Sequence, residues 1–63
     1  MSAVDRLADA VAQEALRLLA QPNSIGLPED VRLEMAITMA YERLSAYPSD
    51  ELDAAIEARV GAR

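Results

Sequence analysis

Side chains that could carry out enzymatic chemistry are scarce in this sequence. The chain has no histidine, cysteine or lysine, so no ordinary nucleophile can be paired with a base. The aliphatic hydroxyls belong to Ser2, Ser24, Thr38, Ser45 and Ser49, and they suit helix caps and loops. Paired carboxylates could do acid and base work, but 63 residues leave little room for a water-excluding pocket. We therefore expect a protein that is not an enzyme, with no catalytic residues and no cofactor.

Four acidic residues near the C-terminus resemble a cation site, because hard cations bind oxygen ligands. They are Asp50, Glu51, Asp53 and Glu57. A calcium-binding EF-hand loop needs a central glycine between alternating ligands, and this segment has none. Acids at the start of a helix complement the positive end of its dipole. We therefore interpret these residues as the beginning of a helix and expect no metal site.

The length and charge of the chain restrict its organisation and its partners. The 63 residues form at most one domain, and a hydrophobic content of 52% is enough for a packed core. A net charge of −5 argues against direct binding of nucleic acid, which needs clustered Lys and Arg. No apolar segment approaches the roughly 20 residues that span a bilayer. We expect no membrane contact and a cytoplasmic location.

Prolines and glycines divide the chain into three segments, and each segment has the pattern of a helix. The predicted helices cover about residues 3–20, 28–46 and 50–60. They predict an all-α fold in which residues 1–63 form one domain, a compact three-helix bundle with a short third helix. We expect the second helix to be central and the third to pack across the other two.

The second predicted helix has two apolar sides. Its core face carries Leu33, Ile37, Ala40, Leu44 and Tyr47 at four-three spacing. A second row, rotated by more than a third of a turn and called the methionine row below, consists of Val31, Met35 and Met39. Either the first and third helices cover both sides, or the methionine row is a seam for a second copy or a partner.

Three further apolar or aromatic residues have predicted positions. Tyr41 lies at the edge of the core face and is a candidate interface anchor. Ile25 and Leu27, in the connection between the first two helices, are expected to tuck under that loop.

Acidic residues recur four positions apart, as Asp5 and Asp9, Asp30 and Glu34, and Asp53 and Glu57. Like-charged pairs at this spacing destabilise a helix by about 0.2–0.5 kcal/mol each. The acids either keep a small apolar protein soluble or form a surface that docks on a basic protein. The candidate carboxylates for such docking are Glu29, Asp30, Glu34, Asp50, Glu51, Asp53 and Glu57.

In size, acidity, helical content and lack of catalytic residues, the chain resembles the small inhibitors that bacteriophages and mobile elements encode, including anti-CRISPR proteins. The resemblance is one of composition and architecture and transfers no individual residue. It implies binding to a nucleic-acid-binding surface of a defence complex, with acidic residues placed where phosphates would lie.

Two functions from different classes follow from these patterns. The leading prediction is a stoichiometric inhibitor or adaptor whose carboxylates face a basic partner protein. The alternative is a structural or regulatory module that forms a homodimer through the methionine row. An antitoxin or transcription-factor role is less favoured, because no basic recognition helix is visible.

Overall fold

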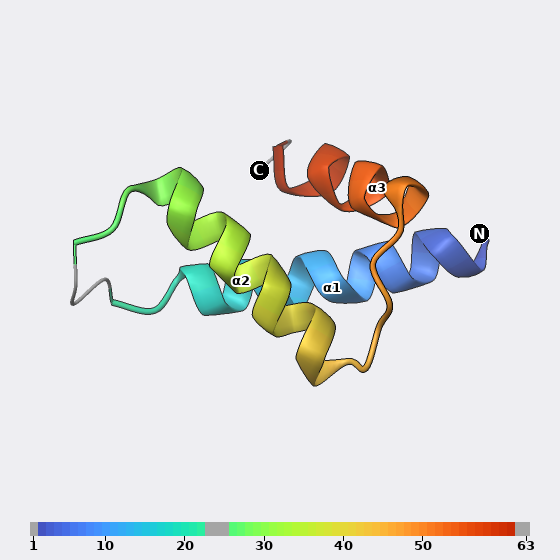
Figure 1. The fold of residues 1–63 in the computed structure, drawn as a ribbon, viewed down its shortest axis with the longest axis horizontal. Helices are drawn as coiled ribbons and strands as arrows, with labels where there is room; N and C mark the ends of the chain where they lie inside the picture. Colours follow the sequence, from blue (N-terminus) through green and yellow to red (C-terminus); the bar gives the residue numbers. More distant parts are fainter. Residues whose placement is uncertain (1, 23–25, 62–63) are drawn as a thin grey trace.

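The three helices begin where short polar side chains or proline favour a first turn. In the computed structural model, which describes residues 2–22 and 26–61, they are α1 (Ala3–Leu19), α2 (Glu29–Arg43) and α3 (Asp50–Gly61) (Figure 1). The Ser2 hydroxyl accepts a hydrogen bond from the Asp5 N–H at 3.1 Å, and the Ser49 hydroxyl accepts one from the Leu52 N–H at 3.1 Å. Each bond satisfies a backbone donor that a helix start leaves without an intrahelical partner.

The core is aliphatic and rich in alanine, as the composition indicates. Its buried residues are Ala8, Val11, Ala12 and Ala15 of α1, Ala36, Ala40 and Tyr41 of α2, and Leu52, Ile56 and Val60 of α3. Alanine lets helix backbones approach closely, so three helices of modest length can share one core. The predicted all-α fold, a compact three-helix bundle with a short third helix, is confirmed.

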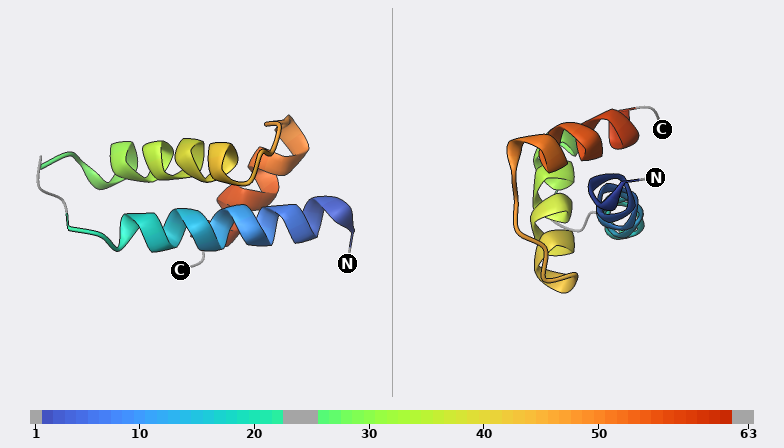
Figure 2. Two further views of the ribbon diagram at one scale, coloured as in Figure 1. Left: turned by 90° about the horizontal axis from the view of Figure 1, so that it is seen from below. Right: turned by 90° about the vertical axis from the view of Figure 1, so that its right-hand side faces the viewer.

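The central helix is α1, so the prediction that the second helix is central was wrong. Both α2 and α3 pack against α1, whereas within the described chain no Cα atom of α2 lies within 8 Å of one in α3. In the right-hand view of Figure 2, α1 is seen nearly end-on with α2 and α3 on two sides of it. The physical reason is the buried stripe of α1, whose small side chains leave room for a helix on each flank.

The end of α2 also differs from its prediction. The helix stops at Arg43 instead of Ala46, and Ser45 adopts a left-handed backbone with φ 52°. The N–H of Ala46 then donates to the carbonyl of Tyr41 at 2.9 Å, and the N–H of Ser45 donates to that of Glu42 at 3.2 Å. These two bonds define a Schellman motif, a common helix stop.

Several residues of the predicted core face lie elsewhere as a result. Leu33 and Ile37 are half-buried against the core and Ala40 is buried, as expected. Leu44 is exposed, and Tyr47 is 90% exposed because it follows the helix stop. Leu27 is half-buried, and Ile25 lies outside the described residues. No helix that the structure describes is long and apolar enough to cross a membrane.

The buried row of α3 predicts a stability contrast. Ile56 is fully buried, so Ile56→Ala should destabilise the fold by about 2–5 kcal/mol. That is a large share of the roughly 3–9 kcal/mol expected for a chain of this length. Met35→Ala, on an exposed face of α2, should change stability by less than about 0.5 kcal/mol. Urea denaturation followed by circular dichroism measures both, and equal effects would contradict the assigned core.

Candidate functional site

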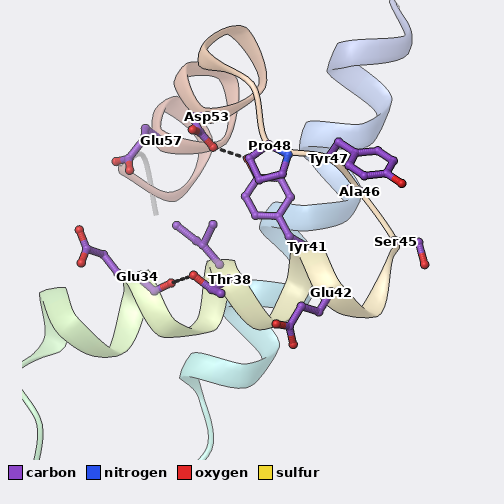
Figure 3. Close-up of a pocket in the computed structure, with 11 residues that line it drawn as sticks. Glu34, Thr38, Tyr41, Glu42, Ser45, Ala46, Tyr47, Pro48, Asp53 and Glu57 are labelled. Atoms are coloured by element: carbon purple, nitrogen blue, oxygen red, sulfur yellow. Dashed lines mark hydrogen bonds between the residues drawn. The ribbon is translucent and has the colours of Figure 1, made fainter.

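A groove opens between α2, α3 and the segment that connects them. We call it the α2–α3 groove; its volume is about 710 Å³. In Figure 3 Tyr41 of α2 extends toward Asp53 of α3, Glu42 points away from α3, and the connection closes one end. The lining residues are Glu34, Ile37, Thr38, Tyr41, Glu42, Ser45, Ala46, Tyr47, Pro48, Asp53 and Glu57. The groove exists because α2 and α3 each pack on α1 and not on each other.

Tyr41 forms the floor of the α2–α3 groove. Its side chain is only 8% exposed, and its hydroxyl donates a hydrogen bond to the Asp53 carboxylate across the groove (Figure 3). Burial, and then this bond and the nearby negative charge, raise the pKa of Tyr41 to about 12. The interface anchor that the sequence predicted here stays a prediction; within the chain the ring is buried, and its hydroxyl links α2 to α3.

The walls of the groove are acidic. Glu34 and Glu42 come from α2, while Asp53 and Glu57 come from α3, and no arginine is among the lining residues. Among the described residues, no arginine lies within 4.0 Å of the carboxylates of Glu34, Glu42 or Glu57. No group of three or more acidic residues in the described chain is placed to hold a metal ion. The walls therefore present negative charge that the described fold leaves uncompensated.

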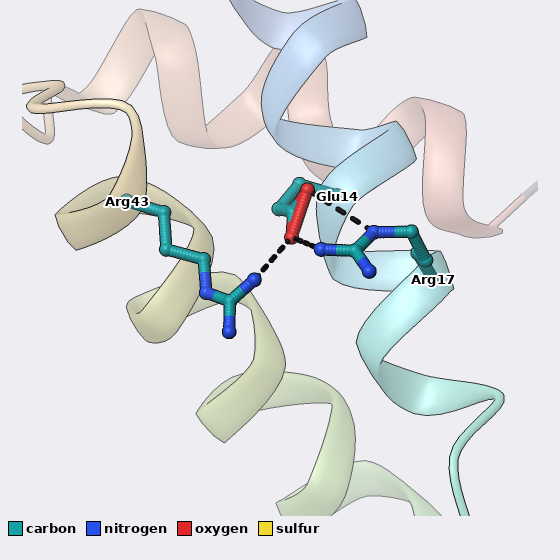
Figure 4. A network of polar contacts seen from close by, with 3 residues as sticks. All are labelled: Glu14, Arg17 and Arg43. Carbon is teal, nitrogen blue, oxygen red and sulfur yellow. Dashed lines mark hydrogen bonds and ion pairs between the residues drawn. The ribbon is translucent and has the colours of Figure 1, made fainter.

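Several arginines contact acidic or carbonyl groups of α1, where α2 and α3 meet that helix. Arg17 and Arg43 both contact the Glu14 carboxylate, Arg43 at 3.0 Å (Figure 4). Hydrogen bonds from Arg17, together with the two positive charges, lower the pKa of Glu14 despite partial burial. The Arg43 contact links α2 to α1.

A second arginine contact fastens α3 to α1. Arg59 donates to Asp9 at 2.6 Å and lies 3.7 Å from Asp5. The sequence predicted that Asp5 and Asp9 would repel each other; instead, a shared cation bridges this pair. Arg32 of α2 donates to the carbonyls of Leu19 and Gln21 at 2.8 and 2.9 Å, near the negative end of α1.

The structure brings together only part of the predicted acidic set. Glu34, Asp53 and Glu57 line the groove. Asp30, Asp50 and Glu51 are exposed but are not among its lining residues, although Asp53, in the same first turn of α3 as Asp50 and Glu51, is; the helix starts of α2 and α3 lie apart in Figure 1. Glu29 lies in a shallower hollow beside Arg32 and the end of α1.

Glu42 is a groove residue that sequence analysis missed. It lies eight positions after Glu34 and four after Thr38, so the three form one row along α2. That spacing could have identified it. The contribution of Tyr47 and Pro48 could not be predicted, because it depends on the path of the connection after the helix stop.

The methionine row is on the surface. Val31, Met35 and Met39 are 37%, 49% and 44% exposed, so of the two alternatives for this row the structure does not support the one in which neighbouring helices cover both sides of α2; a seam for a second copy or a partner stays a prediction. Helical spacing places this row directly beside the row of Glu34, Thr38 and Glu42. An apolar strip therefore adjoins the acidic wall of the groove.

A scan against known protein families, a search of curated proteins and a search of solved structures each found no match to this chain. The geometry and charge of the groove are therefore the observations from which we infer what the protein binds.

The environment of Tyr41 predicts a titration well above the ordinary range of a phenol. In a Tyr47→Phe variant Tyr41 is the only tyrosine, and its absorbance should titrate near pH 12 in the folded protein and near 10 in urea. Because the folded state favours the neutral phenol, Tyr41 contributes to the free energy of unfolding. This contribution is fully present below pH 10 and is lost as the pH rises toward 12. Identical midpoints in buffer and urea would show that the ring is not buried.

Proposed function

We propose that this protein is a small non-enzymatic binding module that captures a basic, nucleic-acid-binding surface of a partner protein and acts as an inhibitor or adaptor. The observation that supports this is the separation of charge. Arginines hold α2 and α3 against α1, while the carboxylates of the α2–α3 groove lack cationic partners among the described residues. A basic partner would supply the positive charges that the groove carboxylates lack among the described residues.

Electrostatics favours such a partner over a neutral one. Two opposite charges 4 Å apart attract by about 1 kcal/mol in water and about 4 kcal/mol at a protein surface of lower effective dielectric. Within residues 2–22 and 26–61, the groove carboxylates Glu34, Glu42 and Glu57 have no ion pair that binding would have to break. A net charge of −5 also speeds encounter with a positively charged protein.

The kind of partner follows from where basic surfaces occur. Proteins that bind nucleic acid carry clustered Lys and Arg to neutralise phosphates. An acidic protein on such a surface would compete with nucleic acid, as the resemblance to phage-encoded inhibitors of the anti-CRISPR type implies. The proposed site of action is the cytoplasm, where such complexes meet their nucleic acids.

Affinity capture from a nuclease-treated bacterial lysate tests this function. We expect retention of nucleic-acid-binding proteins that elute as salt rises, because charge drives the contact. The double variant Glu34→Gln with Glu57→Gln should lose capture, whereas Asp30→Asn with Glu51→Gln, an equal charge change outside the groove, should keep it. A retained protein that is then purified and loaded with nucleic acid should release it when this protein is added. Equal capture by both double variants would contradict the proposal.

A second candidate function is supported by the exposed methionine row. Two copies could bury Val31, Met35 and Met39 against each other, as adaptable apolar residues often do at interfaces. The neighbouring carboxylates of Glu34 and Glu42 oppose this arrangement, because an antiparallel pairing of two α2 helices would bring like charges together.

The oligomeric state distinguishes this candidate from the first. If the row is a dimer seam, Met35→Glu should convert a dimer to a monomer without loss of helicity, as measured by sedimentation velocity and circular dichroism. Because Met35 is 49% exposed in the single chain, the substitution does not disturb the core. A parent protein that is monomeric at every concentration tested would exclude the self-associating module.

A further inference from the structure

We infer that the α2–α3 groove receives one basic amphipathic helix of the partner. This inference depends on the proposed function and specifies how the partner is recognised. The groove combines an apolar floor with an acidic wall on each side, and each of these features constrains the ligand.

α2 and α3 border the groove without packing directly on each other, and the Tyr41 side chain bridges them at its floor. The two helices share α1 as their common support, yet within the described residues their Cα atoms do not approach within 8 Å. The exposed side of α2 that carries Glu34 and Thr38 is opposite to the side on which Ala36 and Ala40 are buried. A helix in the groove would therefore pack on α2 and α3 without displacing α1, which is the common helix-in-groove mode of recognition.

The floor specifies an apolar stripe on the ligand. Ile37, Tyr41 and Ala46 are buried or half-buried, and the exposed Tyr47 and Pro48 extend the apolar surface at the closed end. The Schellman motif at the end of α2 places Ala46 next to Tyr41, so the floor is formed by backbone geometry that is already fixed. Small and medium aliphatic side chains suit such a surface.

The walls specify positive charge on both flanks of that stripe. The contacts of α1 provide a template within the same molecule: carboxylates on α1 meet Arg43 of α2 and Arg59 of α3. In the groove α2 and α3 contribute negative charges instead of arginines: Glu34 and Glu42 come from α2, and Asp53 and Glu57 come from α3. The bound helix must therefore carry Lys or Arg on each side.

A helix meets these two demands together, whereas an extended segment does not. In an extended chain successive side chains point to opposite faces, so basic residues beside an apolar one point away from the groove. In a helix, rows three and four residues apart flank an apolar stripe on both sides. The charge pattern of the groove thus selects a helical ligand.

Two labelled synthetic peptides of identical composition test this inference by fluorescence anisotropy. In one, an alanine and leucine stripe is flanked by arginines at helical spacing; in the other, the order is permuted so that no stripe forms. We expect the first to bind at least about tenfold more tightly than the second. Glu34→Gln with Glu57→Gln should weaken the first by about tenfold or more, and Asp30→Asn with Glu51→Gln by less than about twofold.

Each result has a definite meaning. Equal affinity for the two peptides, or equal losses in the two double variants, would overturn the inference, because binding would then reflect net charge alone. If the helical peptide fails to bind although lysate capture of basic proteins succeeds, the helix-in-groove mode is wrong and the proposed function stands. If capture also fails, the proposed function is wrong as well.

Discussion

The close packing of two helices on the alanine stripe of α1 is the constraint on which the rest of this structure depends. Ala8, Ala12 and Ala15, with Val11 among them, are buried and keep that side of α1 narrow. The small side chains let α2 and α3 each reach the helix from their own direction. With both packed on α1, α2 and α3 are linked across the space between them by the Tyr41–Asp53 hydrogen bond, and that space is the groove.

The charged side chains are also divided between the contacts with α1 and the groove. A bundle with α1 at its centre needs ties from α1 to each flank, and the chain provides them by pairing α1 acids with Arg43 and Arg59. Single exposed ion pairs contribute little, typically less than about 1 kcal/mol. Their larger effect here is on how charge is distributed over the surface, because arginines that are paired with α1 cannot neutralise the carboxylates of Glu34 and Glu57. The pairing of Arg43 and Arg59 with acids of α1 therefore supports the helix packing and also leaves the groove acidic.

Local sequence features predicted the elements well, and long-range features less well. Helix starts at Ser2 and Ser49 follow from capping chemistry, and the apolar spacing identified α3 to within one residue, since the helix includes Gly61 instead of ending at Val60. The end of α2 was misplaced because periodicity continues through Leu44, whereas the backbone reverses at Ser45 ahead of the Tyr47–Pro48 pair, where proline disfavours helix. The central position of α1 was missed because a stripe of alanines is only weakly hydrophobic and does not stand out as a core face. Its small side chains nevertheless let both α2 and α3 pack against α1.

The candidate site shows the same limit. Glu34, Asp53 and Glu57 were singled out as acidic residues at helical spacing, but their convergence depends on how α3 crosses α1, which no local pattern encodes. Three wall carboxylates, those of Glu34, Glu42 and Glu57, make no ion pair within the described fold, whereas the fourth, Asp53, accepts the Tyr41 hydrogen bond that joins α3 to α2. A basic ligand would reduce the repulsion between the walls, and binding to the folded state alone would stabilise that state by mass action. In a chain this short, the carboxylates that contribute least to folding are thus the ones best placed to be stabilised by a partner.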